Sequence, residues 1–201
     1  MKGRAEMKAF TLEIDDLAAL CGFLHAKKLV GLSEKLFRSF PRDGMPAIKK
    51  RLHAHGWIRP AERPNTWHFN EDLMQTLAVA VAPELAVVAI SRAAKKSIVF
   101  YIANNSITEI VNGKDRAVVA SLPDVDALFA EVMKFLDAFP GEIAVAHVAG
   151  NAFDAGHRVT VDERGNLSTK STSLLRAGQT RWSAEVVGTF IRGAMEALRK
   201  G

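Results

Sequence analysis

The chain has 201 residues, of which 48% are hydrophobic and 24% charged, proportions typical of a folded globular protein. Its longest apolar runs are shorter than the roughly 20 residues that a membrane-spanning helix needs, and its first residues carry charge but lack the apolar stretch of a secretory signal. The single cysteine, Cys21, excludes an internal disulfide, so we expect a cytoplasmic protein with no membrane span.

The net charge of +5 is unevenly distributed along the sequence. Residues 27–63 hold ten Lys and Arg but only three Asp and Glu. A basic segment can face nucleic acid or an acidic protein. It is also common on an ordinary solvated surface.

The first 82 residues show helical periodicity interrupted by turn residues. Helices are predicted over 15–26, over 33–40 after Gly31, and over 45–55 after a turn at 41–44. Gly56 suits the end of the third helix. We therefore expect a helical, winged-helix-like region over residues 1–82.

An aromatic segment follows the third helix. "WIRP" (57–60) and "TWHFN" (66–70) flank a polar, Pro-containing tip and predict a small hairpin. Asn70 can cap a helix over 71–82 that ends before Pro83.

The sequence changes period after Pro83. Runs rich in Val and Ile, separated by turn residues, predict strands over 84–91, 96–104, 106–111 and 116–122. An amphipathic helix is expected over 122–139, started by Pro123 and Asp124.

A short internal repeat divides this second region. "PELAVVAI" (83–90) matches "GEIAVAHV" (141–148) at an offset of 58 residues. Strands are predicted over 157–165 and 166–172, joined at Gly165–Asn166, and a helix capped by Ser183 is predicted over 183–200. We expect an α+β fold in which residues 83–201 form two similar strand–strand–strand–helix units, building a pseudo-two-fold antiparallel sheet with packed helices.

The third predicted helix and the hairpin suggest a DNA-binding alternative. In a winged helix, the helix over 46–55 would enter a major groove and the hairpin over 57–69 would be the wing. The residues expected to meet phosphates are basic: Lys49, Lys50, Arg51, Arg59 and Arg63. The helix offers no Asn or Gln for reading adenine.

The sequence supports a metal site or an active site less well than it supports DNA binding. His53 and His55 point about 200° apart on a helix and cannot chelate one ion together, and His68 has no clustered Cys or carboxylate to complete a site. "GNAFDAGH" (150–157) has the composition of an active-site loop and also that of an ordinary polar loop. No nucleophile elbow or phosphate-binding loop is present, so we expect no enzyme activity, no cofactor and no metal.

Protein binding is the remaining interpretation. Trp57, Trp67 and Phe69 have the composition of an interface hot spot, although tryptophans in hairpins commonly belong to a core. The last helix carries small residues near Phe190 and Ile191 that would allow another helix to approach.

The order of parts resembles the EspG family, the cytosolic chaperones that bind secreted PE–PPE pairs in type VII secretion. The similar features are "TLEIDDLAAL", "KRLHAHGWI" and "FNEDLMQTLAVAVAPELAVVAI", followed by a strand meander, a helix and a second related half. The resemblance implies a pseudo-two-fold α+β chaperone without catalytic residues, whose partner is a helical secretion substrate held by the central sheet, its loops and the last helix.

We therefore predict a cytosolic, non-enzymatic chaperone or adaptor. The alternative is a winged-helix DNA-binding regulator with a C-terminal sensor or dimerisation domain, and only this alternative requires nucleic acid. The partner's identity and the oligomeric state are left open. The residues predicted to contact the protein partner are Asn104, Asn112, Phe153, Phe190 and Ile191.

Overall fold

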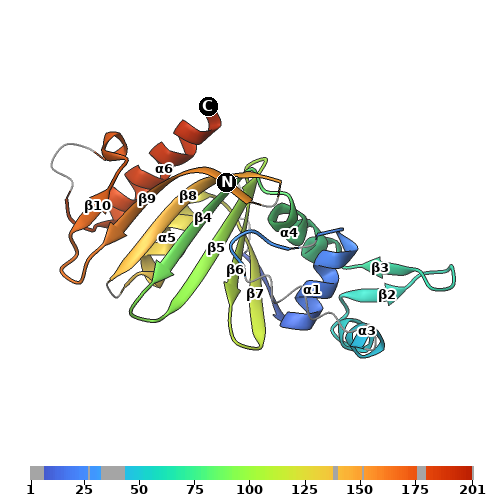
Figure 1. Cartoon of the computed structure of the whole chain (residues 1–201). Coiled ribbons are helices and arrows are strands. Elements are labelled where there is room, and N and C mark those ends of the chain that lie inside the picture. Colours follow the sequence, from blue (N-terminus) through green and yellow to red (C-terminus); the bar gives the residue numbers. More distant parts are fainter. Residues whose placement is uncertain are drawn as a thin grey trace, which may run out of the picture.

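The computed structural model describes residues 7–26, 28–32, 44–137, 140–150, 152–175 and 180–200. They form an eight-stranded antiparallel sheet in the order β1-β7-β6-β5-β4-β8-β9-β10, a separate two-stranded hairpin β2-β3, and helices on both faces of the sheet (Figure 1). The predicted α+β class is confirmed. The helix predicted over 33–40 and most of the turn at 41–44 lie outside the described residues.

The elements have the following bounds: β1 Lys8–Glu13, α1 Ile14–Phe23, α3 Met45–Ala54, β2 Ile58–Pro60, β3 Trp67–Phe69, α4 Glu71–Val81, β4 Leu85–Ser91, β5 Lys96–Ala103, β6 Ser106–Asn112, β7 Arg116–Leu122, α5 Val125–Phe135, β8 Gly141–Ala149, β9 Ala152–Val161, β10 Leu167–Thr169, the 3-10 helix η2 Thr172–Leu174, and α6 Ala184–Lys200.

Local capping signals set several helix ends as the sequence predicts. The Asn70 side chain accepts a hydrogen bond from Leu73 N at 3.0 Å at the start of α4. Asp124 and Ser183 start α5 and α6 in the same way. Gly56 adopts a φ of +70° after α3, a conformation that glycine enters without steric cost.

The first strand was not predicted. Residues 8–13 were expected to lead into a helix, but they form the edge strand β1, whose Lys8 pairs with Ser121 and whose Glu13 pairs with Arg116 of β7. Leu12 is buried and Phe10, on the same face, is partly buried against the same core, while Lys8, Ala9 and Thr11 are exposed. The segment before the predicted helix over 15–26 therefore contributes a strand to the large sheet.

The predicted polar loop over 150–157 is also largely a strand. β9 begins at Ala152, five residues before the predicted start, and pairs with β8 through a register shift between Ala146 and Val148. Gly156 permits the close pairing, because a Cβ there would lie 2.9 Å from Val145 O. Pairing with an apolar neighbour thus overrides the low strand propensity of this segment.

The sheet has a different core on each face. On one face α5 and α6 cover alternate side chains of the central strands, among them Val87, Phe100 and Val145 (the α5–α6 core). On the other face α1 and α4 lie on β1, β5, β6 and β7, with Val99 and Tyr101 buried beneath them, and α3 and the hairpin extend the same core outward (the N-terminal core). In the first predicted unit four strands, β4 to β7, precede α5, and in the second three strands, β8 to β10, precede α6, so the two units differ by one strand.

Among the described residues, no helix has the length and apolar character required to cross a bilayer.

Candidate protein-binding surface

On the sheet face that carries the N-terminal core, part of the sheet has no helix over it among the described residues. β4, β8 and β9 are covered by α5 and α6 from behind, while their front carries no helix in Figure 1. The apolar side chains on this front form what we call the open face: Val88, Ile90, Ala144, Ala146 and Phe153. They line a shallow depression of about 340 Å³.

Phe153 is the most exposed apolar side chain of the open face. It is 45% exposed and pairs across the strands with Val148. Single exposed apolar residues are common on protein surfaces. An exposed phenylalanine beside several half-buried apolar neighbours is instead typical of a binding surface.

The short segment with Val30 and Gly31 lies at the border between the part of the sheet that helices cover and the open face. Val30 is buried against Ala86 and Val148, and the Tyr101 hydroxyl donates a hydrogen bond to Val30 O at 2.6 Å. Burial raises the pKa of Tyr101 well above its usual value, so this hydroxyl keeps its proton and remains a donor. A Cβ on Gly31 would lie 3.5 Å from Phe153 Cζ, so this segment reaches the rim of the open face.

Charged groups flank the apolar side chains of the open face. Glu142 is only 8% exposed, and its carboxylate lies 3.1 Å from Arg158 Nε and 3.4 Å from Arg92 Nη2. A buried carboxylate is tolerated when cations compensate for lost hydration. The two arginine side chains are more than half exposed, so they present positive charge beside an apolar surface.

The structure separates the residues predicted to contact a partner. Asn104 is exposed in the β5–β6 turn, and the register places this turn at the same end of the sheet as the β8–β9 turn next to Phe153. Asn112 ends β6 at the opposite end of that strand. Only Asn104 and Phe153 therefore lie towards the same end of the sheet.

Phe190 and Ile191 are not accessible to a partner. Both are 0% exposed and belong to the α5–α6 core, which corrects their prediction as contact residues. They form the apolar stripe by which α6 packs on the sheet.

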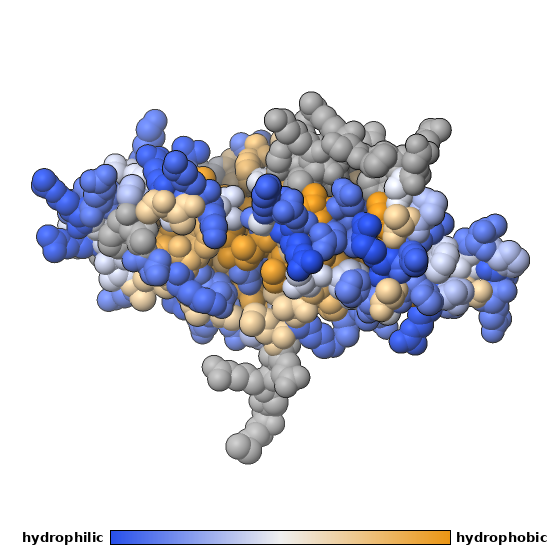
Figure 2. Space-filling model, turned by 90° about the horizontal axis from the view of Figure 1, so that it is seen from below, coloured by the Kyte–Doolittle hydropathy of each residue, from blue (hydrophilic) through white to orange (hydrophobic). Residues whose placement is uncertain are grey.

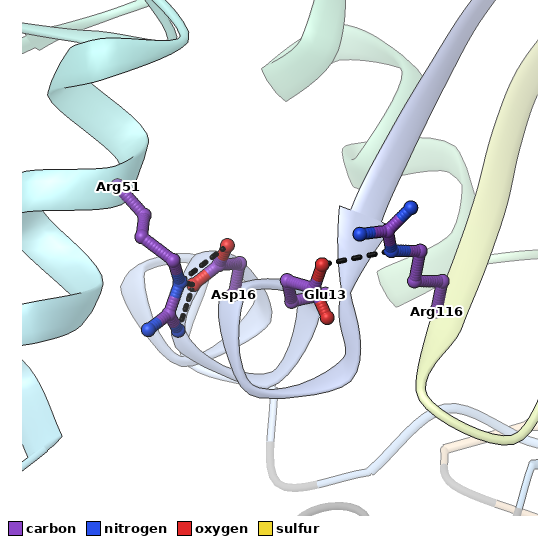
Figure 3. Close-up of polar contacts among 4 residues, drawn as sticks. All are labelled: Glu13, Asp16, Arg51 and Arg116. Carbon is purple, nitrogen blue, oxygen red and sulfur yellow. Dashed lines mark hydrogen bonds and ion pairs between the residues drawn. The ribbon is translucent and has the colours of Figure 1, made fainter.

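The five predicted DNA-contacting residues divide into two groups. Arg51 binds Asp16 of α1 through Nη2–Oδ1 and Nε–Oδ1 distances of 2.6 and 3.2 Å, as Figure 3 shows, and Asp16 is 1% exposed. Lys49 Nζ lies 5.5 Å from the centre of the Trp67 ring. Both side chains fasten α3 to its neighbours, so their prediction as phosphate contacts is not supported. Lys50, Arg59 and Arg63 are exposed.

The described residues contain no group of three or more His, Cys, Asp and Glu side chains that could hold a metal ion. His157 Nδ1 lies 2.9 Å from Ser171 Oγ, a pair that the sequence does not reveal because 14 residues separate its members. In the described part of the chain, no carboxylate hydrogen bonds to this ring as an orienting group would in a catalytic triad. Burial raises the pKa of Cys21 to about 12, which keeps its thiol protonated and poorly nucleophilic.

No family model matches the sequence, and no curated protein matches it. The fold is similar to a chain in the solved structure of the Mycobacterium tuberculosis type VII secretion system chaperone EspG5 in complex with the PE25–PPE41 dimer. The TM-score is 0.58 and the sequence identity 12%, and the match covers 94% of this chain and 96% of that chain. The structural resemblance to EspG predicted from the sequence is confirmed at the level of the fold.

Proposed function

We propose that this protein is a cytoplasmic chaperone or adaptor that binds a helical secreted protein through its open face. The observation that carries the proposal is the similarity, over 94% of the chain, to a chaperone whose structure was solved with a bound protein dimer. The partner would be a secretion substrate of the type VII kind, and the protein would act on it by binding, without chemistry.

The chemistry of the open face fits a helical partner. A helix that carries apolar residues at its tip aggregates when exposed and gains stability when an apolar surface covers it. Phe153 would be the central contact and Asn104 a polar contact at the rim. Arg92 and Arg158 would favour a partner with acidic residues beside its apolar tip.

We also infer that the sheet has a pseudo-two-fold axis between β4 and β8. The offset of 58 residues that aligns the two repeats also relates Val87 to Val145, and these two residues are paired across the strands. Under the same offset the pair Leu85–His147 becomes the pair Ile143–Ala89, which is also present. Strand pairing and sequence repeat thus share one symmetry, which supports a duplicated unit.

Co-expression with helical secreted proteins encoded next to this chain tests the proposed function. A soluble complex should co-purify, and Phe153→Glu should weaken it at least tenfold, because a charge would replace the central apolar contact. Binding is measured by calorimetry or by retention on an affinity column.

Val118→Glu is the matched control. Val118 is also an exposed apolar residue of the sheet, 38% exposed, but it lies on β7 outside the open face. The complex should survive this change. Equal weakening by both substitutions would contradict binding through the open face, and a failure of every such partner to co-purify would contradict the proposed function itself.

A further inference from the structure

Most of the excess positive charge lies at one end of the molecule. Residues 44–70 hold five of the Lys and Arg residues and one acidic residue, so they carry +4 of the net +5. Their described elements are α3 and the β2–β3 hairpin, which projects from the end of the molecule opposite to β10 and α6 (Figure 1). This charge is therefore remote from the open face.

Three of these cations remain available to a partner. Arg51 and Lys49 are engaged with Asp16 and Trp67. Lys50, Arg59 and Arg63 are exposed, and no ion pair in the described part of the chain uses them. We call these three side chains the basic face.

The local structure directs the basic face outward. Ile48 and Leu52 are buried, and Lys50 lies midway between them in sequence, which puts its side chain on the opposite side of α3. Arg59 follows the buried Ile58 in β2, and strand alternation points it away from the core. Arg63 lies in the hairpin tip, where Thr66 N and Oγ1 both bond to its carbonyl oxygen.

The surface around these cations has few of the exposed apolar side chains that a protein partner usually needs. Of the exposed large hydrophobic residues of the described chain, Met7, Phe23, Val118 and Phe153, none belongs to residues 44–70, and Phe23 alone is seen to border the hairpin, with its ring centre 5.0 Å from that of Phe69. Interfaces between proteins are enriched at their centres in apolar and aromatic residues. Interfaces with nucleic acid are polar and positively charged.

The shape of this end also fits a duplex. α3 has ten residues, about 15 Å in length, and exposes the small side chains Ala47 and Ala54 beside Lys50, so its backbone can approach a groove. A major groove about 12 Å wide admits an α-helix. The hairpin beside α3 would then place Arg59 and Arg63 near the phosphates.

We propose that the basic face binds duplex DNA through its phosphates, with little preference for sequence. The exposed side of α3 presents no Asn or Gln to read bases, so the contacts would be electrostatic. This second activity is independent of the proposed chaperone function, since the two use different surfaces of the molecule.

The test is fluorescence anisotropy of a labelled 20-base-pair duplex titrated with the full chain. Three phosphate contacts predict that the logarithm of affinity falls with the logarithm of salt concentration at a slope of about −2.7, so affinity should drop about 40-fold between 50 and 200 mM salt. The variant Lys50→Glu/Arg59→Glu/Arg63→Glu should lose at least tenfold in affinity at 50 mM salt.

The control variant is Lys96→Glu/Lys170→Glu/Arg199→Glu, which makes the same change in net charge at exposed positions elsewhere. It should lose less than threefold. An equal loss in both variants would assign the binding to net charge and overturn the proposal, as would the absence of binding at 50 mM salt. Equally tight binding of polyglutamate would overturn it in favour of an acidic protein partner.

Lysine acylation of the unmodified protein gives a second measurement that does not depend on a variant's folding. The duplex should protect Lys50 from acylation and leave Lys96 reactive. Protection of neither lysine, or of both to the same extent, would overturn the proposal.

Discussion

Glu109 is the residue whose charge is least compatible with its position. It lies on β6 beneath α5, is 7% exposed, and has Glu131 and Lys134 of α5 nearby. Burial, and to a lesser degree the Glu131 charge, raise its pKa from 4.5 to about 7, while Lys134 opposes the shift. The carboxyl group therefore binds a proton more tightly in the folded protein than in the unfolded chain.

The pH dependence of stability follows from this shift. The protonated Glu109 carboxyl group makes a stabilising contribution to the free energy of unfolding. This contribution is fully present below about pH 4.5 and is lost as pH rises to about 7. Glu109→Gln, which removes the charge at nearly constant volume, should therefore stabilise the fold above pH 7, by up to about 3 kcal/mol at 1.4 kcal/mol per pKa unit. Urea unfolding at pH 5 and pH 8 measures the difference between the two proteins.

An exposed carboxylate provides the comparison for Glu109. Glu163→Gln should change the free energy of unfolding by less than about 0.5 kcal/mol at both pH values, since this side chain is exposed. If Glu109→Gln gains no more stability at pH 8 than at pH 5, the carboxyl group is not the source of the effect.

The Asp16–Arg51 pair holds α1 and α3 together. Asp16 is 1% exposed, so Arg51→Met would leave a buried carboxylate without its cation and should cost about 2–4 kcal/mol. The double variant Asp16→Leu/Arg51→Met removes both charges and should recover most of that loss. Urea unfolding of the single and double variants gives the coupling, and additive effects would show that the pair is not energetically linked.

At the scale of the elements, β8 and β9 meet at a glycine. A Cβ on Gly156 would lie 2.9 Å from Val145 O and 3.1 Å from Ala146 Cβ, both on β8. Gly156→Val should therefore push the strands apart and cost about 1–3 kcal/mol, measured by thermal unfolding. Gly22→Ala is the control, because nothing lies within 4 Å of a Cβ there and alanine favours the helix. Equal stability of the two variants would contradict the close approach.

Elements with local signals were predicted well from the sequence. The caps at Asn70, Asp124 and Ser183 and the stop at Gly56 each depend on a few adjacent residues. β1 and the first half of β9 were missed because their strand structure depends on partners far along the chain, β7 for one and β8 for the other. The first half of β9 includes Asp154 and Gly156, and β1 includes Lys, Ala and Glu, residue types that strands disfavour.

At the scale of the whole molecule, the candidate site was only partly predictable. Phe153 was identified from sequence, but the side chains around it come from β4 and β8, which only the fold brings together. Phe190 and Ile191 were misplaced because an apolar helix stripe looks the same in sequence whether it meets a partner or its own sheet. Arg51 was misassigned because its partner Asp16 is 35 residues away.

The two cores share strands, and this predicts a single unfolding transition. In β5, Phe100 belongs to the α5–α6 core while its neighbours Val99 and Tyr101 belong to the N-terminal core. Loss of either core would expose one side of the same strand to water, so neither is expected to persist without the other.

The tryptophans report on the two cores separately. Trp57 and Trp67 pack against the N-terminal core and Trp182 against the α5–α6 core. Trp182→Phe leaves fluorescence from the first core, and Trp57→Phe/Trp67→Phe leaves it from the second. For each variant, urea unfolding is followed both by fluorescence and by far-UV circular dichroism, so that the variant's own stability is taken into account. The urea midpoints from the two signals should coincide in both variants. If instead the regions 1–82 and 83–201 fold as independent domains, the fluorescence of at least one variant would change at a urea concentration distinct from the loss of secondary structure.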